Sequence, residues 1–264
     1  MSHPVHSTIL LLDIEKFSER DDVEQAYLRR MLFELADRAL LDAGIEMTLR
    51  RRADRGDSVM ELIDSNASST ALLRTLLTFV PAELRALNRR ASSSAQMRLR
   101  GVVASGFVAV DGGGGWVGSD LNHACRLLDA DVLRQALRAR PGDDFVLAVS
   151  ETVYQGVVRH NHAGVSADEF HAVTADSKNG PLPAWLHSPG SWAPVPAPEA
   201  DAAAPGPTRQ QPPPHPAPAP APASTFGLGG ATVNGGVFGG DNHGIGGGVF
   251  HGDVRFGSDR GDRG

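Results

Sequence analysis

The sequence predicts an α+β fold, namely a ferredoxin-like split βαβ domain followed by a Pro-rich linker and a Gly-rich repeat tail. Three observations support this class. The predicted elements follow the order β-α-β-β-α-β, with a further helix and further strands after them. Ile9–Leu12 is an apolar run without alternation, which indicates a strand buried on both faces. The composition changes abruptly after Ser188. We expect a mostly antiparallel sheet with its helices on one face.

The first half of the domain is expected to begin with the strand at 9–12 and a helix that opens on the acidic run 19–25. Gly44 is a plausible stop for this helix. A strand hairpin follows at 46–52 and 58–63, around a tight turn at 54–57. A second helix at 66–90 contains Pro81, which is expected to bend or restart it. A strand is expected at 97–110.

The second half opens with a glycine loop at 112–115 and a helical stretch at 118–137, with a break expected near 129–131. A strand at 145–149 leads to Ser150, which is expected to cap a helix at 151–160. Two further strands, 170–173 and 183–187, are expected to form a closing hairpin around 178–180.

Composition and charge restrict the classes of function. The chain has 264 residues and a formal net charge of −6, which argues against nucleic acid or an anionic membrane as its main partner. Its one cysteine, Cys125, excludes an internal disulfide and suits a reducing compartment. No signal peptide or membrane span is recognisable. We therefore expect a cytoplasmic protein.

Three regions follow from the composition: a domain at 1–188, a Pro/Ala-rich linker at 189–224 and a Gly-rich tail at 225–264. The tail contains a repeat, because Gly235–Asp241 recurs as Gly247–Asp253 with an offset of 12 residues. Repeated β-formers between glycine turns can stack as identical rungs. The alternative is a disordered, solvating end, since ordering so much glycine is entropically costly.

Two acidic residues define a candidate metal site. Asp13 ends the first strand, and Asp57 lies in the turn between the second and third strands. In a split βαβ arrangement these places can be neighbours at one edge of the sheet. Two adjacent carboxylates repel unless a dication lies between them, and Mg²⁺ or Mn²⁺ prefers such oxygen ligands. The simpler alternative is that Asp13 only begins a turn.

A second candidate group lies on the predicted helix at 118–137. The i, i+4 spacing places Asn122 and Arg126 on one helical face. An amide that orients a ribose and a guanidinium that neutralises a phosphorane-like transition state would form a suitable pair. The alternative is that Arg126 pairs with Asp129 or Asp131 on a solvated face.

These stretches resemble a known family. DIEKFS (13–18), GDSVMEL (56–62) and VGSDLNHACRLLDA (117–130) resemble the signature blocks of class III nucleotidyl cyclases, the adenylate/guanylate cyclase catalytic domain. The blocks occur in the family's order, and the resemblance covers only the region from about Ser7 to His187. It implies that a nucleoside triphosphate is converted to a 3′,5′-cyclic nucleotide and pyrophosphate, by two-metal catalysis in a homodimer.

The resemblance also implies a role for individual residues. Asp13, Asp57 and the carbonyl of Ile14 would hold two Mg²⁺ or Mn²⁺ ions, and Asn122 with Arg126 would stabilise the transition state. The aspartates would come from one subunit and the Asn/Arg helix from the other. The expected phosphate-binding residues are Lys16, Phe17 and Ser18, through their backbone, and Lys178.

The residues that read the base in purine-specific members are missing. Ala53 and Gly115 stand at the two substrate-binding positions concerned, although a shift of the glycine loop would bring Asp111 to the second. We therefore hypothesise an active cyclase whose base is not chosen in the adenylate or guanylate manner, with a pyrimidine as the candidate base; relatives of this kind act in bacterial antiviral defence. The alternative is a catalytically inactive cyclase-like domain that binds nucleotide or dimerises, and whose tail mediates signalling by homotypic, amyloid-like assembly.

The tail resembles the short Gly-rich amyloid-signalling motifs of some bacterial immune proteins. This resemblance implies that residues 225–264 self-associate or engage a protein with a similar motif.

Overall fold

The computed structural model describes residues 3–111, 115–176 and 180–189. All of them belong to the first of two units into which the chain divides, Met1–Glu199. The predicted linker beyond its first residue and the predicted tail, together with Lys178, lie outside the described residues. The boundary at residue 188 therefore remains a prediction.

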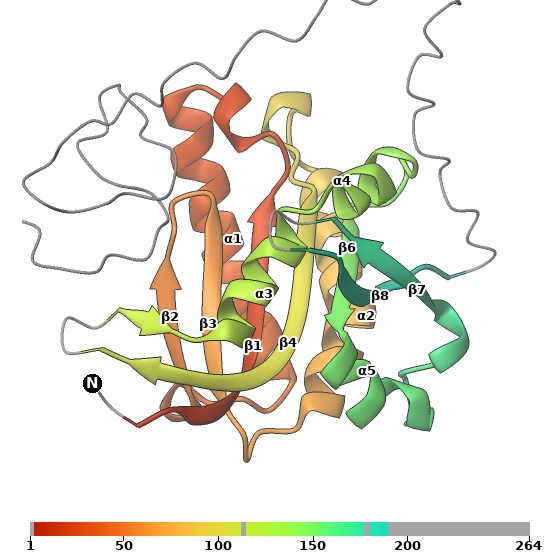
Figure 1. Cartoon of the computed structure of the whole chain (residues 1–264). Helices are drawn as coiled ribbons and strands as arrows, with labels where there is room; N and C mark the ends of the chain where they lie inside the picture. Colours follow the sequence, from red (N-terminus) through yellow and green to blue (C-terminus); the bar gives the residue numbers. More distant parts are fainter. Residues whose placement is uncertain (1–2, 112–114, 177–179, 190–264) are drawn as a thin grey trace, which may run out of the picture. The chain divides into compact units, whose positions relative to one another are not determined.

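The described residues form one sheet with the strand order β2-β3-β1-β4-β6-β8-β7, and β5 pairs with β4 (Figure 1). All pairs are antiparallel except β4 with β6. The strands are β1 (Val5–Ile14), β2 (Arg50–Asp54), β3 (Ser58–Asp64), β4 (Leu99–Val110), β5 (Trp116–Val117), β6 (Phe145–Ser150), β7 (Phe170–Ala175) and β8 (Leu182–His187).

The helices are α1 (Asp22–Asp42), α2 (Ser69–Asn88), α3 (Ser119–Leu128), α4 (Asp131–Arg138) and α5 (Glu151–Gly156). Short 3₁₀ turns lie at Phe17–Glu19, Met47–Leu49, Ser93–Ala95, Val158–His160 and Ala167–Glu169. The order β1-α1-β2-β3-α2-β4, with β2-β3-β1-β4 adjacent in the sheet, is the predicted split βαβ arrangement. The mixed α+β class is thus confirmed.

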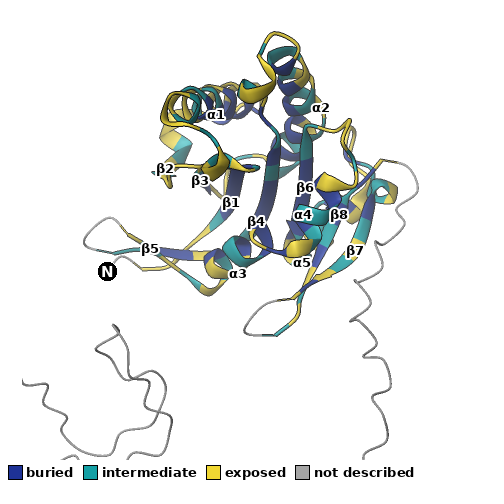
Figure 2. Cartoon of the chain, turned by 90° about the horizontal axis from the view of Figure 1, so that it is seen from above, coloured by how far each residue is buried: buried dark blue, intermediate teal, exposed yellow. Residues whose placement is uncertain are grey.

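The expectation that the helices cover one face is wrong, because the sheet carries a hydrophobic core on each side. Leu10 and Leu12 of β1 pack with α1 and α2 in the first core, whereas Ile9 and Leu11 pack with α3 and α4 in the second. Figure 2 shows α1 and α2 on one side of the sheet and α3 and α4 on the other. The continuous apolar run of β1 follows from this burial on both faces.

Local signals explain most element boundaries. Asp21 and Glu24 form a capping box at the start of α1, and Gly44 beyond its end has a φ of +73°. Ser150 caps α5 by accepting a hydrogen bond from the amide of Val153. The predicted break near 129–131 is confirmed by the separation of α3 from α4.

Three local predictions need correction. Helix α2 continues through Pro81 without restarting, because buried side chains on both sides of it, such as Val80 and Leu84, hold the helix against the first core. Residues 47–49 form a 3₁₀ turn rather than the start of β2, and α5 ends at Gly156 before a separate 3₁₀ turn. Within the described part of the chain, none of the helices combines the length and hydropathy needed to cross a bilayer.

Candidate functional site

The structure brings the ends of β1 and β3 together. Asp13 of β1 pairs in register with Ser58, the first residue of β3, so Asp57 lies one residue from this pairing. The amide of Ile14 donates a hydrogen bond to the carbonyl of Asp57 at 3.1 Å. The negative charge of Asp57 also helps to raise the pKa of Asp13. The two predicted acids are therefore neighbours across the sheet.

Asp13 is buried, with 7% of its surface exposed, and it forms an ion pair with Arg100 of β4. Burial raises the pKa of the Asp13 carboxyl from 3.8 to about 6, against the opposing effect of the Arg100 guanidinium. The negative charges of Asp57 and Asp129 contribute to this rise. Asp13 is thus a carboxylate with a deficit of nearby positive charge, even with Arg100 beside it.

The donor set at this edge suits a hard dication. Asp13 and Asp57 offer carboxylate oxygens, and Asp57 is exposed, so its side chain is accessible. No group of three or more His, Cys, Asp or Glu side chains placed to hold a metal occurs among the described residues. Two carboxylates leave most of an octahedral shell to carbonyl, water or phosphate oxygens. This is the usual situation for Mg²⁺ at phosphate-handling sites.

The segment after β1 is held by a second ion pair. Arg98, which immediately precedes β4, pairs with Glu15 at 2.8 Å and also donates to the carbonyl oxygens of Leu137, Arg140 and Asp143. Lys16 has a φ of +57° and is exposed at the entry to the 3₁₀ turn. The first amides of such a turn have no acceptor within it, so those of Phe17 and Ser18 are suited to an anion.

Helix α3 sits directly on β4. Asp120 lies over Gly106 so closely that a Cβ at residue 106 would overlap its carboxylate, which accepts a hydrogen bond from the amide of Phe107 at 3.0 Å. This close contact sets the height of α3 above the sheet. Leu121, Ala124, Leu127 and Leu128 point into the second core, which leaves Asn122 exposed and Arg126 partly exposed.

Asn122 and Arg126 share one face of α3, as the spacing predicts. Within the described part of the chain, neither side chain makes a hydrogen bond or ion pair. Asp129 and Asp131 pair with Arg134 instead, at 3.9 and 3.0 Å, so the alternative partner for Arg126 is not observed. The C-terminal end of α3 lies near the acids, because Asp129 raises the pKa of Asp13. Within one chain the two acids are therefore neighbours, but neither Asn122 nor Arg126 contacts them.

The two positions expected to face the base are small. Ala53 of β2 packs at the margin of the second core, and Gly115 closes the β4–β5 hairpin. Asp111 uses its carboxylate to accept from the amide of Gly115 at 2.7 Å, and a Cβ at residue 115 would come within 2.5 Å of that carboxylate. No side chain fits at residue 115 unless Asp111 moves. Lys178 lies outside the described residues.

Sequence analysis missed Arg100 as a member of this site. The sequence at 97–110 predicted a strand and gave no partner for Arg98 or Arg100. Their partners, Glu15 and Asp13, become apparent only from the β1–β4 register. Nε and Nη1 of Arg100 are buried without a partner among the described residues, so this side chain retains donors for a further acceptor.

Comparison of the sequence with protein-family models and with curated proteins finds no match. Comparison of the structure finds a bacterial light-regulated adenylyl cyclase with a TM-score of 0.50 and 19% identity, matched over 71% of this chain and 53% of that one. This chain thus spans about half the length of that cyclase chain. An adenylate/guanylate cyclase/hydrolase from Silicibacter pomeroyi gives a TM-score of 0.49 and 20% identity, over 72% of this chain and 100% of the other.

The domain has a class III cyclase fold. At 19% identity the likeness extends to the fold alone, so the reaction has to be argued from the residues.

Proposed function

We propose that this chain is a nucleotidyl cyclase that converts a nucleoside triphosphate to a 3′,5′-cyclic nucleotide and pyrophosphate. The observation that carries the proposal is the juxtaposition of Asp13 and Asp57 at the ends of adjacent strands. The cyclase fold of the domain supports it independently.

In the proposed mechanism, Asp13, Asp57 and the carbonyl of Ile14 would hold two Mg²⁺ or Mn²⁺ ions, which would lower the pKa of the attacking 3′-hydroxyl and neutralise charge on the departing pyrophosphate. The 3′-hydroxyl gives its proton to solvent, its oxygen attacks the α-phosphorus, and the bond from that phosphorus to the bridging oxygen of the β-phosphate breaks, so that pyrophosphate leaves.

The protein's own groups orient this displacement. The backbone of Lys16, Phe17 and Ser18 binds the polyphosphate, and Lys178 adds a positive charge beside it. Asn122 orients the ribose, and the Arg126 guanidinium stabilises the charge that develops on the equatorial oxygens. Because Asn122 and Arg126 contact neither acid within one chain, we propose that a second copy supplies them in a homodimer.

The base specificity is proposed to be non-standard. Ala53 offers no polar group, and Gly115 and Asp111 satisfy one another, so the adenine and guanine readers of purine cyclases have no counterpart here. A smaller pyrimidine base fits this absence best, and a role in bacterial antiviral defence is the corresponding biological proposal.

The test is to incubate the purified full chain with Mn²⁺ and each of the four common nucleoside triphosphates, and to identify products by mass spectrometry. We expect a cyclic product chiefly from UTP or CTP, and its loss in Asp13→Ala and Arg126→Ala. If no triphosphate yields a cyclic product and Asp13→Ala equals the wild type, the catalytic proposal fails.

One observation favours the second candidate, a catalytically silent cyclase-like module. The Arg100 guanidinium already pairs with Asp13, and its positive charge opposes the binding of a metal ion there. Nucleotide binding by the wild type in calorimetry, without turnover in the assay above, would identify this case.

For residues 225–264 we propose homotypic assembly, or assembly with a partner that bears a like motif, on the basis of the 12-residue repeat. A synthetic peptide spanning 225–257 is expected to sediment and to bind thioflavin T. A peptide that stays soluble and unstained would contradict this.

A further inference from the structure

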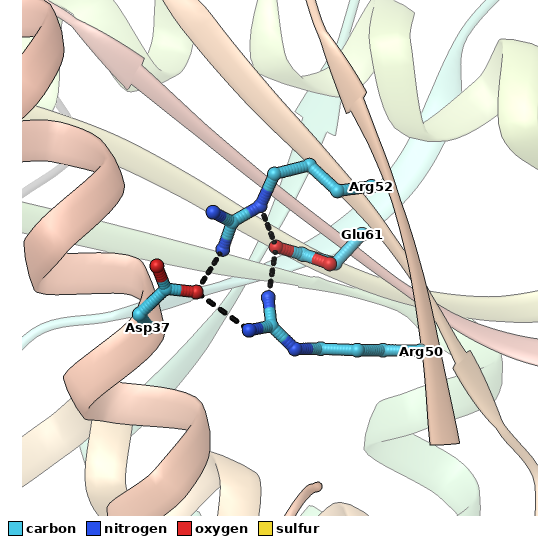
Figure 3. A network of polar contacts seen from close by, with 4 residues as sticks. All are labelled: Asp37, Arg50, Arg52 and Glu61. Carbon is cyan, nitrogen blue, oxygen red and sulfur yellow. Dashed lines mark hydrogen bonds and ion pairs between the residues drawn. The ribbon is translucent and has the colours of Figure 1, made fainter. Parts of the chain in front are cut away.

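Four charged residues form a partly buried network between α1 and the β2–β3 hairpin, which we name the inner network: Asp37, Arg50, Arg52 and Glu61. Glu61 and the Arg50 side chain are buried, whereas Asp37 is exposed. In Figure 3 the two guanidinium groups lie between the carboxylates of Glu61 and Asp37. Arg50 donates to Glu61 Oε1 at 2.8 Å, and Arg52 donates to the same oxygen. Both arginines also donate to Oδ1 of Asp37 on α1, Arg52 at 2.8 Å.

The inner network is a costly arrangement. Glu61 has 0% of its surface exposed and the Arg50 side chain only 8%. Burial raises the pKa of Glu61, against the opposing effect of Arg52 and Arg50. Burial also acts to raise the pKa of Asp37, but the hydrogen bonds from Arg50 and Arg52 outweigh it and lower that pKa.

The network is balanced in charge, with two cations and two anions, but it is not fully satisfied. Arg50 Nε and Glu61 Oε2 are buried without a hydrogen-bond partner in the described part of the chain. Apolar residues of similar volume often stabilise a core as well as a buried ion network does. Stability alone is therefore a weak explanation for charges at this place.

The location of the network suggests a different role. β2 is an edge strand that pairs only with β3, through five residue pairs. The turn beyond it carries Asp57, which is exposed. Apart from the inner network, Arg29 of α1 pairs with Asp54 at the end of β2. On its other side the turn bonds to β1 through the amide of Ile14. The hairpin thus lies between its ties to α1 and the strand that carries Asp13.

We propose that Asp37, Arg50, Arg52 and Glu61 are positioning residues, which fix the β2–β3 hairpin against α1 and so hold Asp57 beside Asp13 as a metal-binding pair. This inference rests on the metal site of the proposed function. Forked guanidinium groups that bridge two carboxylates define an orientation as well as a distance, which a single lysine does not.

The experiment compares full-length Glu61→Gln and Arg52→Lys with the wild type. Glu61→Gln keeps the shape but removes a buried charge, and Arg52→Lys keeps the charge but loses the fork. Metal-free hydrogen exchange is read at the amides of Arg55 and Ile14, which bond to Ser58 and Asp57 across the turn. Mn²⁺ affinity is measured by electron paramagnetic resonance. If Glu61→Gln does not fold, Arg52→Lys decides.

We expect exchange at these two amides to accelerate while amides of α2 and β4 keep their wild-type rates, and Mn²⁺ affinity to fall by about tenfold or more, as for outer-shell partners of metal ligands. The matched control is Glu83→Gln, which breaks the 2.7 Å pair between Arg38 of α1 and Glu83 of α2. This control should change neither the exchange at the turn nor the affinity.

Unchanged exchange at the turn, or exchange that rises equally throughout the domain, overturns the positioning role. If exchange at the turn accelerates in the variants but the wild type binds no Mn²⁺, the network positions the turn, and the metal site of the proposed function is refuted. Local acceleration with unchanged Mn²⁺ affinity overturns the claim that the network serves the metal pair.

Discussion

The Arg100 guanidinium supplies positive charge to the buried Asp13 carboxylate. Both side chains are largely buried, at 12% and 10% exposure, so removing one partner leaves an uncompensated charge. Arg100→Met should therefore lower the free energy of unfolding by about 3 kcal/mol at neutral pH in EDTA, as is usual for a broken buried pair. Urea unfolding measures this.

The loss should depend on pH. The Asp13 pKa, about 6 in the folded wild type, rises further without Arg100, and a carboxyl whose folded pKa is raised loses stability as pH increases. The deficit of Arg100→Met should thus be larger at pH 8 than at pH 5, and Mn²⁺ should restore more stability to it than to the wild type. The partly exposed Arg134, replaced by Met, is the control and should change stability by less than about 1 kcal/mol. A deficit in Arg100→Met that does not vary with pH would contradict the assignment.

A second prediction concerns His187 at the end of β8. Burial lowers the pKa of His187 below 6.5, and the positive charge of Arg140 acts in the same direction. The hydrogen bond with Glu169 at 3.2 Å and the negative charge of Asp143 oppose this decrease. A histidine with a depressed folded pKa contributes stability above pH 6.5, which is lost as pH falls through the folded pKa. The urea midpoint of the wild type should therefore fall more between pH 7 and pH 5 than that of His187→Gln. The exposed His160, replaced by Gln, should retain the wild-type response. Parallel curves for wild type and His187→Gln would refute this.

At the scale of elements, the close packing of α3 against β4 depends on Gly106. A methyl group at this position overlaps the Asp120 carboxylate, so Gly106→Ala should lower stability by about 1–3 kcal/mol through overpacking. Gly142→Ala is the control, because a Cβ there meets nothing within 4 Å. In the Gly106→Ala background, Asp120→Ala should recover part of the loss in chemical denaturation. Full additivity of the two substitutions would show that they do not share a contact.

The sequence predicted the helices and strands better than it predicted which face of the sheet each helix covers. The apolar run of β1, the caps of α1 and α5 and the break between α3 and α4 are local signals, and local signals are visible in a single chain. The placement of all helices on one face was wrong because it depended on where α3 and α4 return across the sheet. The alternate burial of Ile9 and Leu10 in opposite cores already required cover on both sides.

The residues of the candidate site also fall into those that local sequence signals predict and those that only the tertiary structure shows. Asp13 and Asp57 were recognised because each ends or begins a strand, and the split βαβ topology makes such ends adjacent. Arg100 and the inner network were missed because their partners are distant in sequence: Arg100 meets Asp13 across the β1–β4 register, and Arg50 and Arg52 meet Asp37 on a helix. From the sequence alone, a charged residue on a strand is expected to face solvent, and only the strand register shows whether an oppositely charged residue lies beside it.

At the scale of the whole molecule, the unpaired face of Asn122 and Arg126 requires a partner to complete the proposed site. A twofold dimer would contain two sites, each with the acids of one chain and the amide–guanidinium pair of the other. A dimer of one Asp57→Ala chain and one Arg126→Ala chain then contains one site with both defects and one site with neither. Two variants that are inactive alone should therefore restore each other.

Random mixing of these two variants should recover about a quarter of wild-type activity, because about half of the dimers are mixed and each of those has one intact site. Asp13→Ala mixed with Asp57→Ala is the control and should recover nothing, since both sites of that dimer lack an acid. The measurement is product formation after unfolding and refolding the variants together, with the triphosphate that the wild type accepts. Recovery in the control as well would mean that the acids are not confined to one subunit per site. Absence of recovery in the first mixture would place all four residues in one chain's site, although Asn122 and Arg126 have no side-chain partner among the residues that the structure describes.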